Sequence, residues 1–153
     1  MRCSTRLAAE SFNLAIEHEE FQASLAGDGA MVTFAGTTRP CLTTGSPVTG
    51  LFLDHHPRLT IASLREIAED AGRRFDISKI HIVHRCGNLA PGEAIVFVAA
   101  AAPHRRAAFE AVEYAMDRLK TDAVFWKRED TIDGSRWIEP TMIDRVDRAR
   151  WSE

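Results

Sequence analysis

Apolar and polar residues alternate in four segments of the chain, as they do in β-strands with one buried face. The segments are residues 30–38 (AMVTFAGTT), 48–56 (VTGLFLDHH), 79–85 (KIHIVHR) and 123–129 (AVFWKRE). In 79–85 the alternation predicts one core face. A further segment, 94–102 (AIVFVAAAA), is apolar throughout, which is typical of a central strand in a sheet covered on both sides.

Three other segments repeat apolar residues at the three- and four-residue spacing of an amphipathic helix. They span residues 11–24, 61–75 and 103–120. We expect Ser11 to cap the first and Thr60 to precede the second. Pro103 fits the first turn of the third, where its missing N–H group does no harm.

Short connections join these elements. Residues 39–47 hold two prolines and a glycine and are expected to form a surface connection, and 87–93 (GNLAPGE) are expected to form a turn. With one further strand expected before the first helix and one after residue 129, the order is roughly β-α-β-β-α-β-β-α-β-β. It has too many adjacent strands for a doubly wound parallel sheet. The prediction is a single α+β domain over residues 1–153, with a mainly antiparallel or mixed sheet and packed helices.

Composition and charge narrow the possible functions. The formal net charge of −3 over 153 residues argues against a nucleic-acid-binding protein, because such domains are normally basic. No signal peptide or membrane span is visible in the sequence, so we expect a cytoplasmic protein. Cys3, Cys41 and Cys86 have no CxxC spacing and are expected to be free, structural thiols.

Four histidines lie in pairs. His81 and His84 are three residues apart on a strand, so their side chains face opposite sides and cannot hold one metal ion together. His55 and His56 are adjacent and diverge in the same way, and we expect one of them to pack or to form hydrogen bonds. The sequence predicts no metal site and no cofactor.

A basic cluster stands at the start of the third helix. His104, Arg105 and Arg106 lie where free N–H groups and the helix dipole favour an anion and disfavour cations. Two interpretations are open: an exposed basic turn paired with surface carboxylates, or an anion-binding site.

A second basic cluster follows the end of the same helix. Lys120 suits the negative end of the helix dipole. Lys127 shares a strand face with Phe125 and Glu129, whereas Val124, Trp126 and Arg128 share the other. A lysine partly desolvated by such neighbours can lose its proton near neutral pH and act as a base or nucleophile.

Five motifs together resemble a known family. FAGTTR, LDHHP, HRCGNLAPGE, PHRRAAFEAVEYAMDRLK and FWKRE, in this order and at these spacings, are similar to the large, catalytic subunit of molybdopterin synthase. The resemblance runs from about Gly29 to Trp137. It implies an α+β fold and a sulfurtransferase that acts in molybdenum cofactor biosynthesis.

The resemblance also implies a substrate and a protein partner. A small ubiquitin-like carrier subunit with a C-terminal thiocarboxylate supplies two sulfurs to cyclic pyranopterin monophosphate, which becomes the dithiolene of molybdopterin. The large subunit forms a homodimer at the centre of a heterotetramer, with one carrier at each end. This chain ends in RARWSE rather than Gly-Gly, so the sulfur donor must be a separate protein.

The family's site residues carry over to matching positions of this sequence. Lys120 and Lys127 are the expected catalytic residues. The expected substrate-binding residues are Thr37, Thr38, Arg39, His104, Arg105, Lys120, Lys127, Arg128 and Glu129. Two departures stand beside them: Asp122, where a basic residue is common, is expected to weaken the positive field, and Val124, where proline is common, is expected to loosen the turn.

Helix length limits how these residues can meet. His104 and Lys120 are sixteen residues apart, which corresponds to about 24 Å along a straight helix. If both clusters serve one substrate, two subunits must share each site across a two-fold axis. A non-catalytic carrier-binding homologue and a phosphate-handling hydrolase with the same Arg and Lys set remain as alternatives.

Overall fold

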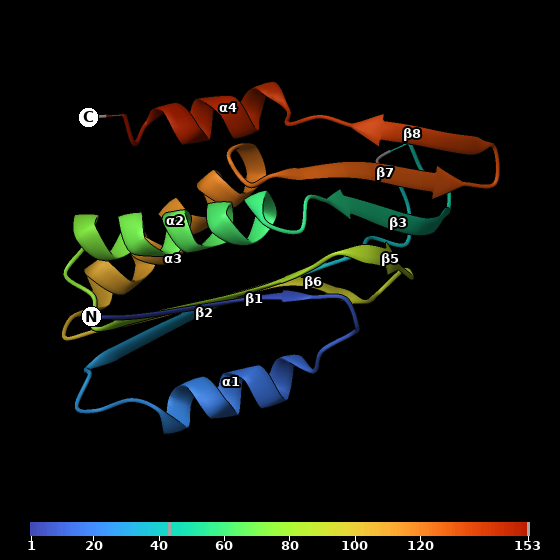
Figure 1. Ribbon diagram of the computed structural model, residues 1–153. Helices are drawn as coiled ribbons and strands as arrows, with labels where there is room; N and C mark the ends of the chain where they lie inside the picture. The colour runs from blue at the N-terminus through green and yellow to red at the C-terminus, as the bar shows by residue number, and fades with distance from the viewer. Residues whose placement is uncertain (43, 153) are drawn as a thin grey trace.

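The computed structural model describes residues 1–42 and 44–152 (Figure 1). Its elements, in chain order, are β1 (Arg2–Ala8), α1 (Leu14–Ala23), β2 (Ala30–Thr37), β3 (Val48–His55), α2 (Leu59–Arg74), β4 (Lys79–Arg85), β5 (Gly87–Leu89), β6 (Ala94–Ala102), α3 (Arg105–Thr121), β7 (Phe125–Thr131), β8 (Gly134–Ile138) and α4 (Met142–Ala149). Thr43, in the expected surface connection, and Glu153, at the end of the expected domain, lie outside the described residues.

Two four-stranded sheets form the framework, with strand orders β1-β4-β6-β2 and β5-β3-β7-β8. Only the β1–β4 pairing is parallel among the strand pairs of the described residues. The predicted α+β class with mixed and antiparallel pairing is confirmed. The division into two sheets was not predicted, because alternation within a strand says nothing about which strand it pairs with.

Helices cover both faces of the first sheet. Figure 1 shows α2 and α3 on one side of it and α1 on the other. The predicted central strand β6 lies between β4 and β2, and its residues from Val96 to Ala102 are buried. The single core face expected for β4 is wrong: Val83 is fully buried in a second apolar cluster with Phe21 of α1.

The helix starts differ from those expected by one or two residues. Asn13, not Ser11, caps α1, and its Oδ1 accepts hydrogen bonds from the N–H groups of Ala15 (2.9 Å) and Ile16 (3.3 Å). At α3 the extended cap residue is His104, so Pro103 lies before the helix rather than in its first turn.

Thr60 lies inside α2 rather than before it. The Nδ1 atom of His56 accepts hydrogen bonds from the N–H groups of Arg58 (3.3 Å) and Leu59 (3.1 Å) and so takes the place of a cap. One histidine of the adjacent pair therefore has the hydrogen-bonding role that we expected.

Two elements were not predicted. The short strand β5 lies within the expected turn 87–93 and pairs with residues 51–53 of β3. Helix α4 follows β8, and a reciprocal capping box between Thr141 and Asp144 begins it.

The backbone just before β2 and the backbone just before α3 approach each other closely at a glycine. A Cβ atom at Gly29 would lie 2.5 Å from the carbonyl oxygen of Pro103, closer than any side chain permits. The absence of a side chain at Gly29 thus lets the backbone before β2 approach the backbone before α3.

Candidate functional site

Three cations lie near one another at the C-terminal end of α3. Arg39 follows β2, Lys120 lies in the last turn of α3 and Lys127 lies in β7. We call these three residues the lysine cluster. Burial, reinforced by the positive charges of Lys120 and Arg39, lowers the pKa of Lys127.

The pairing of β7 sets the position of Lys127. Lys127 stands opposite the buried Leu53 of β3 on one side and Ile138 of β8 on the other. Just before β7, the Thr60 hydroxyl donates a 2.6 Å hydrogen bond to the carbonyl oxygen of Val124. Helix α2 therefore anchors the strand that carries Lys127.

Two carboxylates lie near the lysine cluster. The charges of Glu129 and Asp144 both raise the pKa of Lys127, against the larger effect of burial. Although burial opposes the change, hydrogen bonds from Thr141 and the charges of Lys120 and Lys127 lower the pKa of Asp144. The cations of the cluster thus have acidic neighbours, one of them on α4.

His84 is a buried, neutral neighbour of the lysine cluster. Its ring stacks on Phe125, with centroids 4.2 Å apart, and its Nδ1 lies 2.8 Å from the carbonyl oxygen of Arg85. Burial, helped by the charges of Lys120 and Lys127, lowers the His84 pKa to about 4. The neutral ring must donate through Nδ1 to that carbonyl, so Nε2 is left as an acceptor.

The pair Thr37 and Thr38 leads from β2 to Arg39. Thr37 is exposed, whereas Thr38 is buried. The backbone of Thr38 is paired with Glu93 and Gly92, both at 2.8 Å. Its buried Oγ1 has no hydrogen-bond partner among the described residues.

Arg128 and Glu129 lie on opposite faces of β7, as the alternation predicted. Arg128 is 2.9 Å from Asp130, and its guanidinium lies over the rings of Phe52 and Trp137. It does not join the lysine cluster. Glu129 lies on the Lys127 side, with Oε2 buried and without a hydrogen-bond partner among the described residues.

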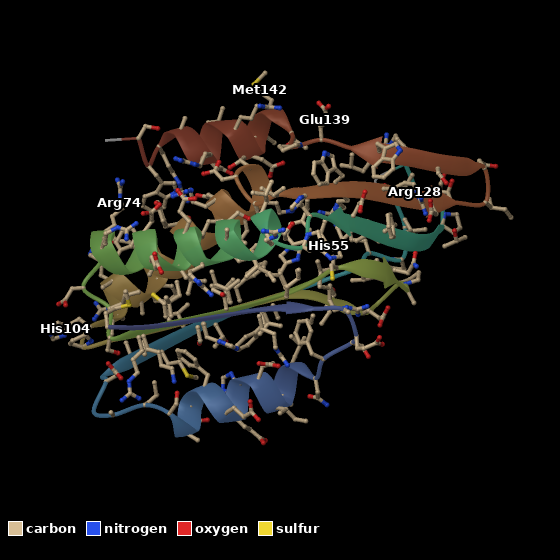
Figure 2. The ribbon with its side chains drawn as sticks, in the orientation of Figure 1. His55, Arg74, His104, Arg128, Glu139 and Met142 are labelled. Carbon is tan, nitrogen blue, oxygen red and sulfur yellow. The ribbon has the colours of Figure 1, made fainter. Side chains whose placement is uncertain are left out.

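His104 and Arg105 lie at the other end of α3. Figure 2 shows His104 at the far end of the helices from His55, and the intervening α3 has 17 residues. Arg106 forms an i,i+4 pair with Glu110 at 3.6 Å, whereas no ion pair within residues 1–42 and 44–152 involves His104 or Arg105. One chain therefore does not bring the two basic clusters together.

Both departures make contacts that the sequence did not predict. Asp122 pairs with Arg118 and, at 2.8 Å, with Arg148 of α4, so two cations balance its charge. The N–H group of Val124 donates a 3.1 Å hydrogen bond to the Ser63 hydroxyl, which a proline could not do. Asp122 thus attaches α4 to α3, and Val124 tethers the turn.

The other histidine of the spaced pair lies far from the lysine cluster. His81 lies on the α1 side of the first sheet, with Nδ1 2.7 Å from the Ser4 hydroxyl and Nε2 3.2 Å from Glu17, so it diverges from His84 as predicted. Within the described part of the chain, no group of three or more potential ligands could hold a metal ion. No helix there is long and apolar enough to cross a membrane.

Two neighbours of the lysine cluster, His84 and Asp144, were missed by sequence reasoning. His84 stands in the motif HRCGNLAPGE but was considered only as a partner of His81. Asp144 lies in a helix that we did not predict, although the spacing of Thr141 and Asp144 in PTMIDRVD is close to a capping-box signature.

Comparisons with known proteins show the family of this chain. The family model described as MoaE protein matches residues 7–122. Two curated relatives, both named molybdopterin synthase catalytic subunit, are 51% identical over 82% of this chain and 81% of the relative (Caulobacter vibrioides) and 43% identical over 97% and 98% (Pseudomonas aeruginosa). The solved molybdopterin biosynthesis MoaE protein from Burkholderia ambifaria has a TM-score of 0.82 and 39% identity, covering 99% of both chains. The chain belongs to the MoaE family.

Proposed function

We propose that this chain is the catalytic subunit of a molybdopterin synthase. It transfers two sulfurs, one from each of two thiocarboxylated carrier C-termini, to cyclic pyranopterin monophosphate. Each carrier leaves with an ordinary carboxylate after its acyl group is hydrolysed, and the product is the molybdopterin dithiolene. Family membership and the names of the relatives support this reaction. The observation that carries the proposal is the lysine cluster, in which a partly buried Lys127 of lowered pKa lies near Lys120 and Arg39.

The chemistry of the substrate suits these residues. Arg39 supplies a guanidinium that can hold the cyclic phosphate through two parallel hydrogen bonds. Attack by the thiocarboxylate and opening of the phosphate ring develop negative charge, which a nearby ammonium stabilises. A lysine of lowered pKa can also move protons during these steps. Lys120 and Lys127 are therefore the catalytic residues of the proposal.

The second basic cluster requires a second subunit. A helix from His104 to Lys120 is about 24 Å long, too long for both ends to touch one pterin. We propose a two-fold homodimer in which His104 and Arg105 of one subunit complete the site formed by the partner's lysine cluster. With one carrier bound at each site, the assembly is a heterotetramer.

One incubation separates this function from its alternatives. The purified protein is mixed with cyclic pyranopterin monophosphate and a thiocarboxylated carrier, and dithiolene product and free phosphate are measured. We expect product only when the carrier is present. Carrier binding without product would indicate a non-catalytic homologue, and phosphate release without a carrier would indicate a hydrolase.

We also place the protein in the cytoplasm. Its three cysteines, Cys3, Cys41 and Cys86, are free, which suits a reducing compartment. Cell fractionation with antibody detection tests this placement, and recovery from a periplasmic fraction would contradict it.

A further inference from the structure

Helix α4 presents its apolar residues to solvent. Met142, Ile143 and Val146 form one stripe of the helix and are 75%, 72% and 62% exposed. Figure 2 shows Met142 pointing away from the body of the molecule. The partly buried residues of this helix are instead charged, including Asp144 and Arg148. This is the reverse of an ordinary surface helix, which buries its apolar stripe.

Polar contacts hold α4 in place. Arg148 pairs with Asp122, and Arg150, just after the helix, pairs with Asp117, each at 2.8 Å. The indole N–H of Trp151 donates a 2.6 Å hydrogen bond to the same Asp117 carboxylate. The attachment of α4 to α3 thus makes no use of the apolar stripe, and a contiguous exposed stripe of this kind marks an interaction surface.

The stripe adjoins the lysine cluster. Arg148 of α4 pairs at 2.8 Å with Asp122, two residues after Lys120, so the helix lies beside the end of α3 that carries this lysine. On the inner face of α4, against the opposing effect of burial, the charges of Lys120 and Lys127 help to lower the pKa of Asp144. A second exposed apolar surface, which includes Trp126 and Trp137, lies on the face of β7 opposite Lys127. A partner bound to the Trp126 face could reach Lys127 only around the edge of the sheet. A partner bound to α4 would lie on the Lys127 side of β7.

We propose that the exposed stripe of α4, formed by Met142, Ile143 and Val146, binds the globular body of the sulfur carrier. This inference rests on the proposed function. An extended tail spans about 3.3 Å per residue, so a carrier whose terminal thiocarboxylate reaches Lys127 must rest its body within a few residues' length of the lysine cluster. The α4 stripe meets that requirement and offers the apolar centre that stable interfaces have.

The test uses the whole chain and a carrier with an ordinary C-terminal carboxylate, so that binding is measured without turnover. The triple variant Met142→Gln, Ile143→Gln, Val146→Gln removes the apolar side chains and introduces glutamine, which favours helices. Its matched control is Ile132→Gln, which changes an 82% exposed residue in the β7–β8 turn. Titration calorimetry measures the Kd, amide hydrogen exchange reports whether α4 still forms, and sedimentation reports the oligomeric state.

We expect the triple variant, with α4 intact, to bind the carrier at least about tenfold more weakly, and the control to bind like the wild type. Wild-type affinity in the triple variant would overturn the inference. So would a loss of homodimer with normal carrier binding, because the stripe would then be covered by a second copy of this chain. A wild-type protein that binds the carrier through α4 but forms no dithiolene would instead refute the proposed function alone.

Discussion

We expect Lys127 and Lys120 to contribute little to folding and to be essential for turnover. Lys120 is exposed and Lys127 is only partly buried, so each charge contributes about 1 kcal/mol or less to stability. Loss of a contact that forms in the transition state typically costs about 100-fold or more in rate. We therefore expect Lys120→Ala and Lys127→Ala to lose most activity while the thermal midpoint barely changes.

Lys79→Ala is the matched control for both lysine variants. Lys79 begins β4 and contacts the Ser24 hydroxyl and the Phe21 ring, at the opposite end of the strand from His84. Dithiolene formation by this control should match the wild type. Near-normal product formation by both site variants would remove the two lysines from the mechanism.

His84 makes a testable contribution to the pH dependence of stability. Its pKa falls from 6.5 to about 4 in the folded protein because of burial. As the pH falls from about 6.5 toward 4, the unfolded chain binds a proton at this residue and the folded chain does not, so the free energy of unfolding decreases. Denaturant titrations across this range should show a shallower decrease for His84→Gln than for the wild type.

His81→Gln provides the comparison for the His84 variant. Burial also lowers the pKa of His81, so its variant should flatten the same curve, but it lies on the α1 side of the sheet and should leave turnover unchanged. Parallel curves for His84→Gln and the wild type would mean that His84 gains its proton equally in the folded and unfolded states.

At the scale of elements, Asp122 is the residue that attaches α4. Its carboxylate joins Arg118 of α3 to Arg148 of α4, and hydrogen bonds to charged groups are worth about 1.5–3 kcal/mol. We expect Asp122→Asn to speed amide hydrogen exchange throughout Met142–Ala149 while the exchange of β6 stays slow. Unchanged exchange in α4 would show that the Asp117 contacts suffice to hold the helix.

The sequence predicted an element correctly where the spacing of its apolar residues is enough to define it. The prediction failed where contacts with other elements define it. The central burial of β6 was predicted because its segment is apolar throughout. The opposite faces of Lys127 and Arg128 were predicted because side chains alternate along any strand. The strand β5 was not, because three residues carry no period and only their pairing with β3 defines them. The approach of His84 to the lysine cluster depends on the packing of β4 against Phe125, which no local pattern shows.

The resemblance to a family contributed what local patterns could not. It grouped Arg39, Lys120 and Lys127 into one site, and the structure brings these three together. It could not say how Asp122 acts, because the effect of that charge depends on Arg148, in a helix that we did not predict.

At the scale of the whole molecule, the shared site makes a quantitative prediction for mixed dimers. An Arg105→Ala chain paired with a Lys120→Ala chain has one undamaged site and one doubly damaged site. Random exchange makes about half of the dimers mixed, so activity should recover to about a quarter of wild type. If subunit exchange is verified by mass spectrometry and activity stays at the level of the separate variants, the shared-site arrangement is wrong.

The contact between Gly29 and Pro103 also bears on how this chain can vary in evolution. Strand β2 has eight residues and α3 has 17, and at about 3.3 Å and 1.5 Å per residue both are roughly 26 Å long. The two elements start together near Gly29 and pack side by side. Because their lengths are equal, Arg39 after β2 and Lys120 near the end of α3 lie at the same distance from that start. An insertion or deletion in only one of these elements would move Arg39 away from Lys120. Natural length variation should therefore be absent from β2 and α3 and concentrate in connections such as the one after Arg39.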